Sequence, residues 1–167
     1  MTGPLTRLLA QRSLLILDGA MGTELERRGV DIGLPLWSAN ALIHCPEVVL
    51  DIHRDYIEAG ADIITTNTFR TNRRVFKNAG LPDRSLELTT KAVELAHRAR
   101  EAYPDRTILV AGSVAPVEDC YHPERVPSMS ELQDEHGEMC ERLARLGVDF
   151  LLLETMTTIR EASTACA

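Results

Sequence analysis

Near its N-terminus the chain reads Leu14-Leu15-Ile16-Leu17-Asp18-Gly19-Ala20-Met21-Gly22-Thr23, and the rest of the sequence is best interpreted from this segment. Four consecutive apolar residues predict a short strand that is buried on both faces. Asp18 ends the run, and the two glycines then allow a tight turn and a close approach to a neighbour. A carboxylate at the carboxyl end of a buried strand, before a glycine-bearing loop, is typical of a ligand site in a β/α protein. The alternative is that Asp18 only caps the next helix and that the glycines only form a turn.

Two later segments repeat one pattern. Residues 59–69 and 146–156 align without gaps, and each contains glycine, a small residue, aspartate, an apolar strand and a polar residue. Another apolar run, at 107–111, is followed by glycine and serine. This pattern predicts repeated βα units with parallel strands. The four polar residues at the predicted strand ends are Asp18, Asn67, Ser113 and Glu154.

Parallel strands place their carboxyl ends at one edge of a sheet. Two carboxylates, an amide and a hydroxyl are therefore expected to converge there, which is difficult to explain by packing alone. The sequence thus predicts a polar small-molecule site, most simply one that binds an ammonium group.

The spacing of the strand ends indicates the fold class. A βα unit takes about 45 residues, whereas a complete eight-stranded barrel typically needs about 250 residues. An open doubly wound sheet would suit the length better, but the sequence contains neither G-x-G-x-x-G nor a P-loop. We therefore predict an α/β fold built of parallel (β/α) units of a TIM-type barrel, with about four of the eight units in residues 1–167. These residues are expected to form a single domain without an internal boundary.

One later helix carries a histidine on its apolar face. Ser130 and Gln133 match a capping box that would open this helix. Leu132, His136 and Leu143 then recur at helical spacing. A helix that precedes a strand lies away from the carboxyl ends of the strands, so we predict a core or rim role for His136 rather than a catalytic one.

Composition limits the classes of partner. With 44% hydrophobic residues in 167, the chain can bury a core. A net charge of −7 without a basic block disfavours nucleic acid, and no segment is long and apolar enough to predict a membrane partner. No signal peptide is recognised at the N-terminus, so a cytoplasmic protein is expected. The four cysteines are widely spaced and form no C-x-x-C pair, which disfavours both a disulfide framework and a local zinc knuckle. They are Cys45, Cys120, Cys140 and Cys166.

Five motifs in order, covering nearly all of the chain, resemble those of the homocysteine S-methyltransferase family. They are DGAMGTEL (18–25), PLWS (35–38), GADIITTNTF (60–69), GSVAP (112–116) and GVDFLLLET (147–155). The PLWS segment is most similar to the short-chain branch, whose members use S-methylmethionine or S-adenosylmethionine.

This resemblance implies an N-terminal half of a homocysteine-binding (β/α)8 barrel. It implies that Asp18 and Glu154 hold the amino group of homocysteine and that Asn67 lines the same pocket. It also implies that the backbone N–H groups of Gly19, Ala20 and Met21 receive the carboxylate. The family transfers a methyl group from a sulfonium, ammonium or folate-type donor to the thiol of homocysteine, which gives methionine.

The resemblance also implies zinc in the complete family enzyme. The family holds zinc with three cysteines, one after a later strand and an adjacent pair near the C-terminus, and none of the four cysteines here matches those motifs. We expect those ligands beyond Ala167, so no metal ligand and no catalytic residue is identified in this chain.

Half of a barrel would expose strand edges and an apolar inner face, so we expect either self-association or a missing C-terminal half. Two alternatives stay open. One is a non-catalytic truncated half-barrel, and the other is a different β/α-barrel enzyme with an ammonium-bearing substrate.

Overall fold

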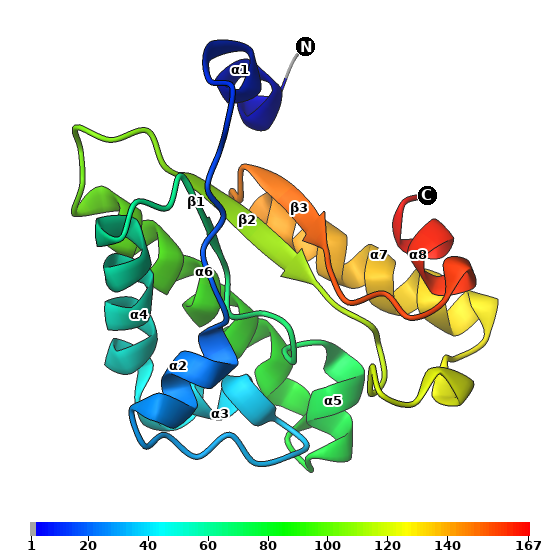
Figure 1. Cartoon of the computed structure of the whole chain (residues 1–167). Coiled ribbons are helices and arrows are strands. Elements are labelled where there is room, and N and C mark those ends of the chain that lie inside the picture. The colour runs from blue at the N-terminus through cyan, green and yellow to red at the C-terminus, as the bar shows by residue number, and fades with distance from the viewer. Residues whose placement is uncertain (1–2) are drawn as a thin grey trace.

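The computed structural model describes residues 3–167 (Figure 1). The three strands are β1 (Ile63–Thr65), β2 (Leu109–Val114) and β3 (Phe150–Leu153). The α-helices are α1 (Pro4–Gln11), α2 (Met21–Arg27), α3 (Asn40–His44), α4 (Pro46–Glu58), α5 (Arg73–Asn78), α6 (Ser85–Glu101), α7 (Met129–Arg145) and α8 (Ile159–Ala165). Short 3-10 turns cover Trp37–Ala39, Pro82–Arg84 and Pro123–Arg125. Within residues 3–167, none of the helices combines the length and apolar character that a membrane span requires.

The three strands form one parallel sheet in the order β1-β2-β3. Residue Ile63 of β1 pairs with Leu109 of β2, and Ala111 of β2 pairs with Phe150 of β3. Each connection between neighbouring strands contains at least one helix, as parallel pairing requires. The predicted alternation of strands and helices, with parallel pairing, is confirmed.

The outer face of the sheet is covered by helices α4, α6 and α7 (Figure 1). Ile64 and Val110 of the sheet share a core with Ile52 of α4 and Leu88 of α6, and all four are at most 1% exposed. A smaller cluster includes Leu8 of α1 together with other residues of the strands. The helices therefore pack against the sheet and position the ends of its strands.

The segment at 14–17 is not the strand that we predicted. It follows β1 through hydrogen bonds such as Asp62 N to Ile16 O at 2.8 Å, but only Leu17 forms a β-bridge, with Ile63. The side chains of Leu14, Ile16 and Leu17 are 72%, 50% and 47% exposed. The prediction of burial on both faces is therefore wrong, because the segment has a pairing partner on one edge only among the described residues.

The N-terminus of α7 differs in register from the prediction. Ser128, not Ser130, is the N-cap residue, and its capping box uses Glu131. Both pairs fit the sequence pattern, but the Glu131 carboxylate accepts from Ser128 N at 3.0 Å and is also 3.0 Å from Arg74 Nη1. His136 is buried at 3% exposure and lies 3.2 Å from a carboxylate oxygen of Glu161. This contact fits the predicted core role of His136.

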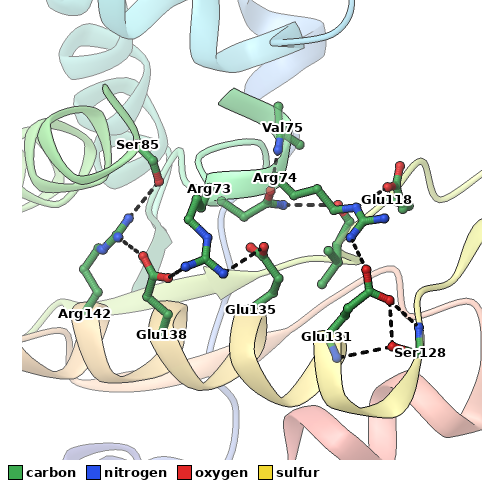
Figure 2. A network of polar contacts seen from close by, with 12 residues as sticks. Arg73, Arg74, Val75, Ser85, Glu118, Ser128, Glu131, Glu135, Glu138 and Arg142 are labelled. Carbon is green, nitrogen blue, oxygen red and sulfur yellow. Dashed lines mark hydrogen bonds and ion pairs between the residues drawn. The ribbon is translucent and has the colours of Figure 1, made fainter. Parts of the chain in front are cut away.

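Ion pairs join α5 to α7, which belong to consecutive βα units (Figure 2). Arg73 lies 3.2 Å from Glu135 and 3.0 Å from Glu138, and Arg74 pairs with Glu131 and Glu118. Isolated exposed pairs contribute little, but several shared partners fix the position of a helix more firmly. The network therefore ties the segment after β1 to the helix before β3.

Candidate functional site

A cavity of about 630 Å³ lies at the carboxyl end of the strands. Its walls come from the segment around Asp18, from the residues after β1, from the residues after β3 and from two loops. All six residues predicted from the sequence line it, namely Asp18, Gly19, Ala20, Met21, Asn67 and Glu154. The tertiary structure thus brings together residues that are up to 136 positions apart in the sequence (154 minus 18).

Asp18 is attached to the end of β1. Its carboxylate accepts hydrogen bonds from Thr65 N at 2.7 Å and from Thr65 Oγ1 at 2.8 Å. It does not cap α2, because Ala20 is the N-cap residue and no side chain bonds there. The pKa of Asp18 is raised from 3.8 to about 6, mainly by burial and to a smaller extent by the nearby charge of Glu154, against the Thr65 hydrogen bonds that lower it.

Glu154 follows β3 and is held by two contacts with β2. Its backbone N–H donates to Val114 O at 3.1 Å, and its carboxylate accepts from the hydroxyl of Ser113. Ser113 was predicted at the same edge, and it supports Glu154 rather than lining the cavity. Because Glu154 and Asp18 are close enough for their charges to interact, a cation bound between them would relieve their repulsion.

The two glycines after Asp18 are required by aromatic side chains. A Cβ atom at Gly19 would lie 2.7 Å from the hydroxyl oxygen of Tyr56. A Cβ atom at Gly22 would lie 2.3 Å from Cζ2 of Trp37. The close approach predicted from the sequence therefore occurs, and its partners are aromatic rings.

Backbone donors are available beside these glycines. Within residues 3–167, the N–H groups of Gly19, Ala20 and Met21 donate to no protein acceptor. All three residues line the cavity. Unused backbone N–H groups at a cavity wall are suited to bind an anionic group.

Trp37 and Asn67 form another part of the wall. The Trp37 ring meets Phe69 edge to face, with centroids 5.4 Å apart. Its φ of 48° is unusual for a bulky residue and stores backbone strain, as is common at binding sites. Asn67 is 3% exposed and donates to Ser38 O at 3.0 Å, so it holds the Trp37 loop against the end of β1.

Among the cavity residues that sequence reasoning missed are Arg70, Cys120 and Tyr121. Arg70 lies five residues after the end of β1, and a cation so close to a polar strand end could have indicated a site residue. Cys120 and Tyr121 come from the long loop between β2 and α7, which has no periodicity that would place them. Their positions depend on tertiary contacts alone.

Comparison with known proteins identifies the family. The sequence model described as Homocysteine S-methyltransferase matches residues 15–167, which is most of the chain. The chain belongs to the homocysteine S-methyltransferase family. It is 39% identical over 170 residues to the homocysteine S-methyltransferase of Escherichia coli (strain K12), which covers 95% of this chain and 55% of that relative. It is 34% identical over 176 residues to the selenocysteine methyltransferase of Astragalus bisulcatus, covering 88% of this chain and 52% of the relative.

Solved structures of the family agree with the fold. The crystal structure of the homocysteine methyltransferase MmuM from Escherichia coli, in its metallated form, matches with a TM-score of 0.87 and 38% identity. The match covers 96% of this chain and 60% of that protein. The family assignment and the parallel α/β fold predicted from the sequence are therefore confirmed. The chain spans about half the length of the curated relatives it matches.

The side chains described here do not fit the zinc site that the family implies. Among residues 3–167, no group of three or more His, Cys, Asp or Glu side chains could hold a metal ion. Cys120 lines the cavity, whereas Cys45, Cys140 and Cys166 do not.

Proposed function

We propose that this chain forms the amino-acid-binding part of an enzyme that transfers a methyl group to the thiol of homocysteine and so produces methionine. The observation that carries this proposal is the pair of carboxylates, Asp18 and Glu154, at one cavity in a chain of this family. The acceptor is homocysteine, and the donor is of the sulfonium class used by the branch that the PLWS segment resembles.

The carboxylate pair is suited to the ammonium group of homocysteine. Thr65 fixes Asp18, and Ser113 fixes Glu154, so neither carboxylate has to be ordered when the ligand binds. The raised pKa of Asp18 means that the empty cavity holds its negative charge at a cost. An ammonium group would remove that cost, which makes the pair selective for cationic ligands.

The carboxylate of homocysteine would be received by the N–H groups of Gly19, Ala20 and Met21, as the resemblance implies. Asn67 would line the same pocket. The thiol itself needs activation, because its pKa of roughly 8.5 leaves it mostly protonated near neutral pH. The described residues supply no metal ligand set for that step, so we assign to this chain the binding and orientation of the amino acid only.

Three further expectations belong to this proposal. They are a cytoplasmic location, a single folding domain over residues 1–167, and self-association or assembly with a separate C-terminal half. The exposed apolar side chains of Leu14, Ile16 and Leu17 support the last of these, because apolar side chains side by side on a surface favour association.

Binding calorimetry with homocysteine under reducing conditions tests the proposal. Glu154→Gln should weaken binding by about 2–5 kcal/mol, the range for removing one partner of a buried charge pair. Glu141→Gln, on the exposed side of α7, is the control and should bind like the wild type. Unchanged affinity in Glu154→Gln would refute the ammonium assignment.

A second assay separates an enzyme from a non-catalytic half-barrel. Protein whose intact mass corresponds to 167 residues is incubated with S-methylmethionine as the donor and with either homocysteine or selenocysteine as the acceptor. Selenocysteine is included because relatives carry the name selenocysteine methyltransferase. We expect binding without turnover, and methionine formation by this chain alone would show that activation of the thiol has been assigned wrongly.

A further inference from the structure

Arg70 is a buried cation without a hydrogen bond. The residue is 9% exposed, and its Nε atom is buried without a partner. The nearest acidic atom, Asp119 Oδ1, is 3.7 Å from Arg70 Nη2, which is an ion pair but is too long for a hydrogen bond. That oxygen already accepts from Tyr121 N at 3.0 Å. Among residues 3–167, this guanidinium therefore donates no hydrogen bond, and Asp119 provides only a loose ion pair.

The two arginines of α5 behave differently. Arg73 and Arg74 keep 51% and 30% of their side chains exposed, yet each has two carboxylate partners (Figure 2). A guanidinium has five N–H donors, and burying it without acceptors is unfavourable. Arg70 is thus more buried than these neighbours and less well bonded, which is expected of a group that awaits a ligand rather than one that stabilises the fold.

Arg70 also lines the cavity that contains Asp18 and Glu154. The cavity therefore offers two carboxylates, Asp18 and Glu154, and one cation that is loosely paired with a third carboxylate, Asp119, and donates no hydrogen bond. This arrangement complements a zwitterion, because the guanidinium fork matches the two oxygens of a carboxylate. We propose that Arg70 binds the carboxylate of an amino-acid ligand in this cavity, an inference that rests on the proposed function and adds a residue to it.

The carboxylate could belong to either of two ligands. One source is homocysteine itself, in which case Arg70 supplements the N–H groups beside Gly19. The other is the methyl donor, in which case Arg70 selects donors that carry a carboxylate. The chemistry at Arg70 is the same in both cases, and two pairs of ligands distinguish them.

The experiment measures Kd for each ligand and for its decarboxylated analogue. The first pair is homocysteine and 3-aminopropane-1-thiol. The second pair is S-methylmethionine and 3-aminopropyl-dimethylsulfonium. The variants are Arg70→Gln and the conservative Arg70→Lys, and the control is Arg125→Gln, an exposed arginine outside the cavity. Hydrogen bonds to charged groups contribute about 1.5–3 kcal/mol, so Arg70→Gln should raise Kd for a carboxylate ligand roughly 10- to 100-fold.

A selective loss supports the proposal. If Arg70→Gln weakens the binding of homocysteine but not of 3-aminopropane-1-thiol, Arg70 binds the carboxylate of the acceptor. If it weakens the binding of S-methylmethionine but not of its decarboxylated analogue, Arg70 binds the carboxylate of the donor. Arg70→Lys should recover part of the affinity. Equal losses for a ligand and its decarboxylated analogue would show general disruption of the cavity and would overturn the proposal. Unchanged Kd values for all carboxylate ligands would do the same.

Denaturation of the ligand-free chain provides an independent readout. If Arg70 awaits a ligand, Arg70→Met removes a buried charge that donates no hydrogen bond and has only a loose ion pair with Asp119, so it should not lower the midpoint of urea unfolding. A lowered midpoint would mean that the contact with Asp119 is structural, which contradicts the proposal. Asp18→Asn separates this inference from the proposed function. If that variant keeps its affinity while Arg70→Gln loses affinity for carboxylates, the ammonium assignment fails and the role of Arg70 stands.

Discussion

Asp18→Asn should change the pH dependence of stability in a way that identifies the raised pKa. In the folded chain the pKa of Asp18 is about 6, against an ordinary value of 3.8. Between these two values the unfolded chain loses the proton while the folded chain keeps it, so rising pH favours unfolding. Each pKa unit corresponds to about 1.4 kcal/mol, so the ionised Asp18 lowers the free energy of unfolding by about 3 kcal/mol above pH 6.

Asparagine removes this cost but also loses one hydrogen bond. The amide retains a single oxygen, whereas the carboxylate accepts from both Thr65 N and Thr65 Oγ1. The lost bond costs about 1 kcal/mol. The variant should therefore be more stable than the wild type by about 2 kcal/mol at pH 7.5 and slightly less stable at pH 4. The ligand-free protein thus gains stability from a change that removes a proposed binding group.

Urea unfolding of both proteins from pH 4 to pH 8 measures this difference. The free energy of unfolding of the variant minus that of the wild type should rise by about 2–3 kcal/mol between pH 4 and pH 6.5 and then remain constant. Taking the difference cancels the other titrating groups of the chain. Asp105→Asn, at an exposed position before β2, is the matched control. A difference that stays flat or falls as the pH rises would refute the argument, because it would mean that the Thr65 hydrogen bonds outweigh burial.

Three other substitutions test separate features. Gly22→Ala should destabilise the chain by about 1–3 kcal/mol in urea unfolding and weaken homocysteine binding, because the new Cβ would lie 2.3 Å from Trp37. The control is Gly137→Ala, which has open space around it and should be neutral or stabilising. His53 is fully buried with both ring nitrogens unbonded, and burial lowers its pKa from 6.5 to about 4. As the pH falls, the unfolded chain takes up this proton before the folded chain does. The wild type should therefore lose about 2–3 kcal/mol of free energy of unfolding between pH 7 and pH 4.5, and His53→Leu should abolish that loss. Equal acid sensitivity of the two proteins would argue against a lowered pKa of His53. Ile16→Lys places a charge on an exposed apolar segment and should reduce self-association in sedimentation velocity, whereas an unchanged distribution of species would exclude this segment from the contact.

Much of the candidate site could be predicted before the structure was known. The apolar runs before Asn67 and Glu154 identify β1 and β3, and the run before Asp18 identifies the segment that pairs with β1, together with the polar residues that follow them. Local patterns of this kind act within a few residues, so they are visible in the sequence. Parallel topology then requires the strand ends to meet at one edge, and all three residues do line one cavity.

Other features depend on contacts between distant parts of the chain, and only the tertiary structure decides them. The apolar run at 14–17 predicts a buried strand, yet its exposure depends on which strands lie beside it. The burial of Asp18, the reason for glycine at position 22 and the unused donors of Arg70 have the same origin. In each case the partner, or its absence among the described residues, is set by packing between elements rather than by neighbours in the sequence. The sequence by itself identified Asp18, Asn67 and Glu154 at the edge of the sheet, and the tertiary structure added Arg70 and determined which groups are satisfied by the protein and which remain available for a ligand.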